Sequence, residues 1–152
     1  MQDRPNYSEL LAAIEHFLHT EIVPNTEGAR GFHARVAANA VRTVRRELEA
    51  EDGQLAREWA GLDSLLGLAE QPLGRAALRE GIAARNAELC ARIRLGDADG
   101  GDFGEHVREH VRRSVRDKIS VSNPDLLSRS AGWPGRAGDP HPPASAPSRK
   151  AE

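Results

Sequence analysis

Two histidines and a glutamate in residues 106–110, HVREH, match the H-x-x-E-H pattern of one class of zinc metalloprotease. Histidines four residues apart point the same way on a helix, and a glutamate can act as a base. Such a site also needs a third ligand from a later helix, and the chain after Ile119 is short. Glu109 is also turned by about 100° from His110. We therefore interpret the motif as a solvated helix face and predict no catalytic residue, metal or cofactor.

A row of arginines lies on the longest predicted helix, residues 31–48. At about 100° per residue, four arginines share one side of this helix, and the opposite side is apolar. Guanidinium groups bind carboxylates and phosphates through paired hydrogen bonds. A solvated face balanced by nearby glutamates is the alternative interpretation. The candidate interaction or site residues are His33, Arg35, Asn39, Arg42, Arg45 and Arg46.

His33 and Cys90 have simpler structural interpretations. His33 falls near the middle of the apolar side of residues 31–48, which indicates a core or boundary histidine with a hydrogen-bond partner. The alternative is that His33 and Asn39 line a site. Cys90 lies beside an apolar seam and is interpreted as a small buried hydrophobe without an activating partner.

Composition limits the function classes. The formal net charge is -2 and aromatic residues make up 4%, which argues against nucleic-acid binding. The sequence contains no long apolar run and no recognisable signal peptide, and its single cysteine fits a reducing compartment. We expect a cytoplasmic protein with no membrane span. Glycine-rich nucleotide-binding motifs are absent as well.

Periodicity and capping signals predict an all-α fold of four or five helices packed as an antiparallel bundle. Asn6 and Glu9 form a capping-box pattern before a helix that ends at Pro24. After residues 31–48, an acidic break at 49–54 separates a helix over 55–69, which is followed by helices over 74–95 and from Asp102 to Ser122. The predicted core comprises Phe17, Leu18, Phe32, Val36, Val44, Trp59, Leu62, Leu66, Val107 and Val111.

The last part of the chain differs in composition. Residues 129–152 are rich in glycine, proline, serine and alanine, and cannot bury enough apolar surface to offset the entropy of ordering. We expect a helical domain over residues 1–128 and a disordered tail over 129–152.

Three stretches resemble a bacterial family of small helical domains of unknown function. They are MQDRP with ELL at residues 9–11, FHARVAANA at 32–40, and DKI at 117–119 with Asn123-Pro124. Members of that family occur alone or fused to proteins of the aminoglycoside-phosphotransferase type, and are often encoded near acyl-CoA dehydrogenases. The resemblance covers about residues 1–124 and supplies no catalytic residues.

We therefore expect a non-enzymatic accessory domain that binds a protein partner, either a phosphotransferase-like enzyme or an acyl-CoA dehydrogenase. The motivation is the amphipathic arginine helix, the missing catalytic set and the resemblance. The alternative is a helical domain, enzymatic or not, that recognises an anionic ligand of the phosphate or CoA type through His33, Asn39 and the arginines. Self-association is left open by the sequence.

Overall fold

The structure, a computed structural model, describes residues 3–130. Over that range the chain is helical and contains no strand, which confirms the all-α class. The elements are α1 (Tyr7–Phe17), the π-helical turn η1 (Leu18–Ile22), α2 (Gly28–Leu66), α3 (Arg75–Arg94), α4 (Gly101–Ser122) and α5 (Pro124–Ser130). The predicted tail beyond residue 130 lies outside the described residues, and its first predicted residue, Arg129, belongs to α5.

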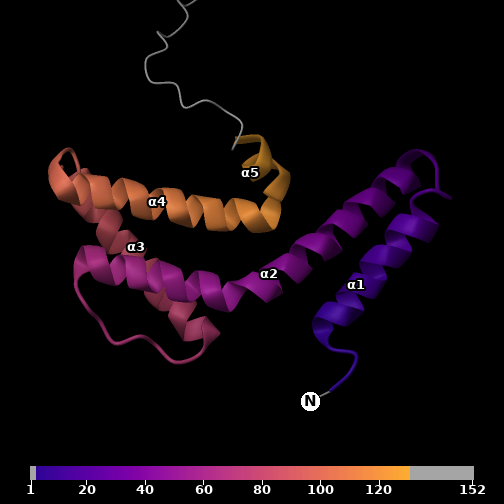
Figure 1. Cartoon of the computed structure of the whole chain (residues 1–152), viewed down its shortest axis with the longest axis horizontal. Coiled ribbons are helices and arrows are strands. Elements are labelled where there is room, and N and C mark those ends of the chain that lie inside the picture. The colour runs from indigo at the N-terminus through magenta and orange to yellow at the C-terminus, as the bar shows by residue number, and fades with distance from the viewer. Residues whose placement is uncertain (1–2, 131–152) are drawn as a thin grey trace, which may run out of the picture.

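The 39-residue helix α2 is the spine of the molecule (Figure 1). At 1.5 Å per residue it extends about 58 Å. Helix α1 packs along its N-terminal half, whereas α3 and α4 pack along its C-terminal half. The predicted break at residues 49–54 was wrong. Gly53 costs a helix only about 1 kcal/mol, and the buried Glu51 in the same segment forms ion pairs with Arg75 and Arg79 of α3.

The helices do not all run antiparallel. Helices α1 and α4 run antiparallel to α2, as expected. Helix α3 runs in the same direction as α2, because the loop over residues 67–74 carries the chain back along the spine before α3 begins (Figure 1). Two ion pairs fix this direction, Arg75 with Asp52 at 2.6 Å and Arg85 with Asp63 at 3.0 Å.

The helix ends follow local signals with one exception. The capping box is confirmed, because the Asn6 side chain accepts from the Glu9 amide at 3.0 Å and the Glu9 carboxylate accepts from the Asn6 amide at 2.8 Å. The predicted cap at Asp102 is wrong. Helix α4 begins at Gly101 after Gly100, and Asp102 lies in its first turn, where a carboxylate favours the positive end of the helix dipole.

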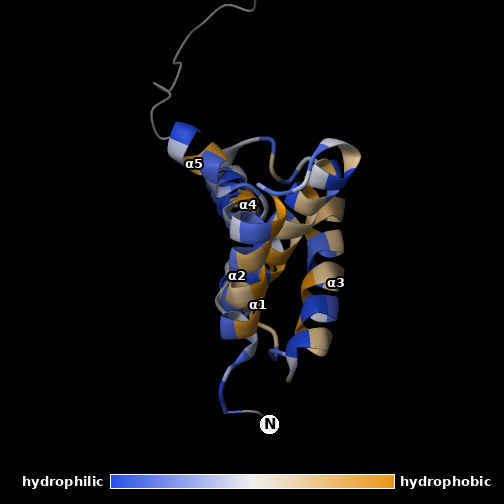
Figure 2. Cartoon of the chain, turned by 90° about the vertical axis from the view of Figure 1, so that its right-hand side faces the viewer, coloured by the Kyte–Doolittle hydropathy of each residue, from blue (hydrophilic) through white to orange (hydrophobic). Residues whose placement is uncertain are grey.

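The hydrophobic core lies where α2, α3 and α4 meet (Figure 2). Its buried residues are Trp59, Leu62, Leu65, Leu78, Ile82, Leu89 and Val107. Of the predicted core, Trp59, Leu62 and Val107 are therefore confirmed, and Leu18 and Leu66 are half-buried. The prediction was wrong for five side chains that are exposed: Phe17, Phe32, Val36, Val44 and Val111.

The N-terminal half of α2 explains most of these errors. It turns small residues toward α1, and Gly31, Ala34 and Ala38 are the buried residues there. The wider apolar side chains of the same half-helix stay outside, and His33 is exposed rather than part of a core. Cys90 is exposed as well. Among residues 3–130, no helix is both long and apolar enough to cross a membrane.

Candidate functional site

The arginine row serves mainly to hold α1 against α2. The carboxylate of Glu15 on α1 accepts hydrogen bonds from Arg42 Nε at 2.7 Å and from Arg45 Nη2 at 3.2 Å. A second group of Arg42, Nη2, lies 2.5 Å from His19 Nε2, and because a guanidinium group only donates, the ring nitrogen is the acceptor. Arg42 and Arg45 are thus both engaged within the chain, although the buried Nε of Arg45 has no hydrogen-bond partner among the described residues.

The pKa of Glu15 reflects this pairing. Burial is the largest single influence and raises the pKa, because it disfavours the charged carboxylate. The hydrogen bonds and positive charges of Arg42 and Arg45 together outweigh burial, and the pKa of Glu15 lies below its usual value. The carboxylate is therefore charged at neutral pH and locks the hairpin formed by α1 and α2.

The other four candidate residues are not brought together. Arg46 Nη1 donates to the backbone carbonyl of Val121 at 2.9 Å, which ties the end of α4 to the spine. Arg35 and Asn39 are exposed, one turn apart, and His33 lies on a different side, with its ring against Phe32 at 5.7 Å. The six candidates therefore do not form one site.

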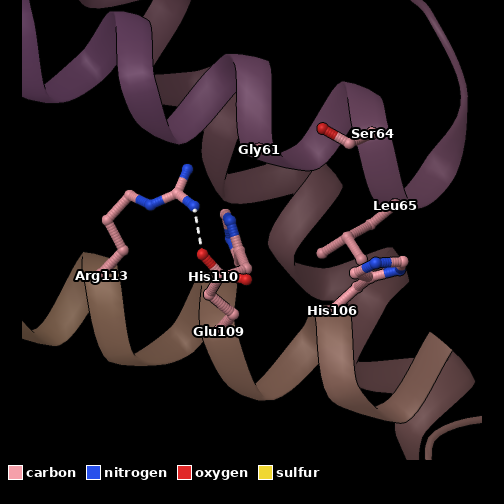
Figure 3. Close-up of a pocket in the computed structure, with 7 residues that line it drawn as sticks. All are labelled: Gly61, Ser64, Leu65, His106, Glu109, His110 and Arg113. Carbon is pink, nitrogen blue, oxygen red and sulfur yellow. Dashed lines mark hydrogen bonds and ion pairs between the residues drawn. The ribbon is translucent and has the colours of Figure 1, made fainter. Parts of the chain in front are cut away.

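A small polar pocket lies between α2 and α4 at the H-x-x-E-H motif (Figure 3). It has a volume of about 180 Å³ and is lined by Gly61, Ser64, Leu65, His106, Glu109, His110 and Arg113. The ring of His110 packs against the backbone at Gly61, whereas His106 lies near Leu65 (Figure 3). Glu109 is engaged by Arg113 at 3.1 Å.

This pocket gives no support to a zinc protease. Within residues 3–130 no group of three potential ligands is placed to hold a metal. Burial is the main influence on the pKa of His110 and lowers it, and the positive charges of Arg113 and Lys118 lower it further against the opposing charge of Glu58. His110 is therefore a neutral packing residue at pH 7.

A longer groove runs between α3 and α4. Both helices pack against α2, but they approach each other through side chains at the end near their connecting loop, where Arg92 lies over the ring of Phe103 at 4.3 Å. Away from the loop they separate, leaving a cavity of about 210 Å³. We call this the α3–α4 groove. Its apolar half is lined by Leu89, Cys90, Ile93, Val111 and Val115.

The other half of the groove is acidic. It continues along α2 as a cavity of about 170 Å³ that shares Glu58, Ser114 and Lys118 with the apolar half. Of the four carboxylates in its lining, Glu51 pairs with Arg75 and Arg79, and Asp117 pairs with Arg57, which leaves Glu47 and Glu58 without an ion pair to the described part of the chain. Glu47 is exposed there and makes no hydrogen bond or ion pair with the described part of the chain.

The sequence alone did not reveal this groove. Val111 was predicted to lie in the core, but in the structure it is exposed, and so are Ile93 and Val115. An apolar seam that extends beyond its partner helix indicates a groove. The sequence does not show where α3 and α4 separate, so it cannot show which residues of the seam stay uncovered.

Comparison with known proteins identifies a family. The family model described as "Domain of unknown function (DUF6285)" matches residues 24–126, and the chain belongs to this family. The match covers α2, α3 and α4 and reaches into α5, while α1 precedes it. Neither a curated protein nor a solved structure matches the chain.

Proposed function

We propose that this member of the DUF6285 family is a non-enzymatic accessory domain that binds a partner protein by accepting one of its helices in the α3–α4 groove. The observation that carries the proposal is the apolar half of the groove, where Ile93, Val111 and Val115 are exposed around the buried Leu89. Grooves of this kind accept the apolar face of an amphipathic helix.

The two halves of the groove define the partner helix. Apolar side chains at spacings of three and four residues fit the half lined by Ile93, Val111 and Val115. Basic side chains further along the same helix fit the acidic half, where Glu47 is free to pair. Binding should therefore weaken as salt is raised, because Glu47 is exposed to solvent.

The partner we propose is a phosphotransferase-like enzyme or an acyl-CoA dehydrogenase in the cytoplasm. The resemblance of residues 32–40 and 117–124 to domains fused to the first class and encoded near the second supports this choice. The exposed, unpaired Cys90 is compatible with a reducing compartment.

The experiment uses Cys90 as a reporter, because it is the only cysteine of the chain and lines the groove. The native protein serves as bait for purified phosphotransferase-like and acyl-CoA dehydrogenase candidates from the same host. The reaction rate of the Cys90 thiol with a chromogenic disulfide is measured with and without each candidate. We expect fast reaction alone and protection, at least about tenfold, when the groove is filled.

Two substitutions make the test specific. Val115→Glu places a charge in the groove at a side chain that is 48% exposed, so folding is retained and partner binding should be lost. Leu73→Glu is the matched control, because Leu73 is 95% exposed in the loop before α3. Equal binding by both variants, or binding that leaves the Cys90 rate unchanged, would exclude the groove.

For the alternative, a domain for anionic ligands, His33 and Asn39 do not join the arginines in one site, so we choose the pocket at His106, His110 and Arg113 for its test. Thermal unfolding in the presence of inorganic phosphate and of CoA tests it. A ligand at 100 times its Kd adds about 2.7 kcal/mol to stability. A shift of that size, removed by Arg113→Ala, would favour the alternative over the accessory domain.

A further inference from the structure

The hairpin formed by α1 and α2 leaves several large apolar side chains exposed. Helix α1 has no buried residue, and the buried residues of the facing half of α2 are small. Larger apolar side chains of α1 are exposed instead, namely Tyr7, Leu10, Ile14 and Phe17. Their spacing of three, four and three residues is that of a helix-bundle seam.

Each helix of the hairpin carries two neighbouring seams. In α1 the seam toward α2 comprises the half-buried Ser8, Leu11 and Glu15 and continues into η1 at Leu18 and Ile22. Each residue of the exposed seam of α1 immediately precedes, in the sequence, a residue of the seam that faces α2. A helix in a four-helix bundle needs two adjacent seams, because it packs against two neighbours. The hairpin thus has the seam pattern expected for half of a four-helix bundle.

The second exposed seam is on α2. It comprises Ala37, Val41, Val44 and Leu48, again spaced by four, three and four residues. Ala37 and Val44 are exposed, and Val41 and Leu48 are half-buried. These residues also lie one position before the residues that contact α1, such as Arg42 and Arg45. Because α1 and α2 run antiparallel, an equal rotation in each brings both seams to the same side of the hairpin.

The two exposed seams are level with each other. Ser8 bonds to Glu49, and Glu15 bonds to Arg42, so residue numbers that add to about 57 lie side by side in the hairpin. Ile14 is therefore level with Val44, and Leu10 with Leu48. We call the surface formed by these two seams the hairpin face.

We propose that the hairpin face binds the same face of a second copy, giving a two-fold symmetric dimer in which each α1 lies on the partner's α2. The two-fold axis runs parallel to the hairpin helices. This operation preserves the level of every residue, so Ile14 of each copy packs against Val44 of the other.

The position of α3 selects this arrangement. Helix α3 approaches α2 from Glu51 onward, through the pairs of Arg79 with Glu51 and Arg75 with Asp52. Helix α1 begins at Tyr7, level with about residue 50 of α2. If α1 of a second copy lies at the same level, its N-terminal end therefore reaches the level at which α3 begins. A two-fold axis perpendicular to the helices would instead carry the hairpin tip of one copy toward α3 of the other.

The charge of the hairpin face agrees with a second copy as the occupant, and its size indicates a weak dimer. At the hairpin tip the seam of α1 and η1 ends in the exposed Glu21, and the seam of α2 ends in the exposed His33 and Arg30. Because residue numbers that add to about 57 are level, Glu21 of one copy lies within about one helical turn of His33 of the other and about two turns from Arg30. The 16 residues of α1 and η1 give a face about 24 Å long and, for two helices, about 20 Å wide. Counted over both copies this is about 960 Å², below the roughly 1,200 Å² at which specific stable interfaces begin, so the dimer should be weak and dissociate on dilution.

Two charged variants test the proposed pairing by sedimentation velocity over a concentration series. Ile14→Glu and Val44→Lys each place a charge at a side chain that is about half exposed in one copy, 48% and 47%, so the monomer should fold. We expect a reversible dimer for the wild-type chain and a dissociation constant raised more than about tenfold in each variant. Helical circular dichroism and melting of each variant provide the folding control.

The decisive sample is a mixture of the two variants. Glu at position 14 of one chain meets Lys at position 44 of the other, while the second contact keeps wild-type Ile14 and Val44, so a heterodimer should form in the mixture. A monomeric wild-type chain, dimeric single variants, or a mixture that stays monomeric would each overturn the proposal. Val115→Glu should dimerise as the wild type does, so failure of this proposal is distinguishable from failure of the α3–α4 groove.

Discussion

The close approach of α2 to α4 depends on Gly61, and Gly61→Ala tests it. A Cβ atom at this position would lie 2.9 Å from Cε1 of His110 and closer still to its Nδ1. The ring of His110 is 6% exposed and is held between the two helices, so it cannot swing away as a surface side chain would. The substitution must move the ring or separate α2 from α4.

Two opposing contributions determine how much Gly61→Ala changes the free energy of unfolding. Alanine is favoured over glycine inside a helix by about 1 kcal/mol. Overpacking a well-filled contact costs about 1–3 kcal/mol. Gly53→Ala in the same helix is the matched control, because the nearest atom to its added Cβ is Arg57 Nη1 at 3.3 Å, the far end of a flexible side chain. We expect Gly53→Ala to raise the free energy of unfolding. The free energy of unfolding of Gly61→Ala should be about 1–3 kcal/mol lower than that of Gly53→Ala.

Urea unfolding followed by circular dichroism at neutral pH measures these differences, and a double-mutant cycle assigns them. His110→Ala removes the ring, so the added methyl group of Gly61→Ala then fits into the space left behind. The two substitutions should therefore couple by about 1–3 kcal/mol. If Gly61→Ala stabilises the chain as Gly53→Ala does, or costs the same with and without the His110 ring, the argument for a close contact fails.

Two further predictions concern charge and pH. Burial lowers the pKa of His110 in the folded protein, so the unfolded state binds more protons as pH falls below about 6.5. The free energy of unfolding should therefore decrease with falling pH until the lowered pKa is passed. His110→Gln should reduce this dependence of the melting temperature on pH, and an unchanged dependence would refute the assignment. Glu15→Gln should lower the free energy of unfolding in urea at pH 7 by about 1–3 kcal/mol, because it removes the negative charge and one of the two oxygens that accept from Arg42 and Arg45. The difference from wild type should disappear in acid, as the Glu15 carboxyl group is protonated through its lowered pKa.

Features set by neighbouring residues could be predicted from the sequence. The Asn6–Glu9 capping box, the extent of α3 and the end of α4 before Asn123-Pro124 follow from local backbone chemistry. Trp59, Leu62 and Val107 were also predicted correctly, because the C-terminal half of α2 meets other helices on the side that its apolar pattern indicates. These features do not depend on which distant helix supplies the contact.

The arginine row shows where such reasoning stops. A helical wheel separates Arg42 and Arg45 from Val36 and Val44, but it does not state which side another helix will cover. Glu15 on α1 offers a carboxylate at the level of the arginines, so α1 packs on the polar side and the apolar side remains outside. The available signal was the repeat of small residues at Gly31, Ala34 and Ala38, which lets two helices approach closely.

The continuity of α2 links the two proposed surfaces. A break at residues 49–54 would have left the hairpin face and the α3–α4 groove on separate helices joined by a hinge. Instead Glu51 and Asp52 pair with arginines of α3 within an unbroken helix, so the hairpin and the three-helix core share one continuous element. A dimer through the hairpin face would then present two α3–α4 grooves in a fixed relation at one end of the assembly. Such a bivalent arrangement favours partners that are themselves dimers, because the second contact forms at high effective concentration.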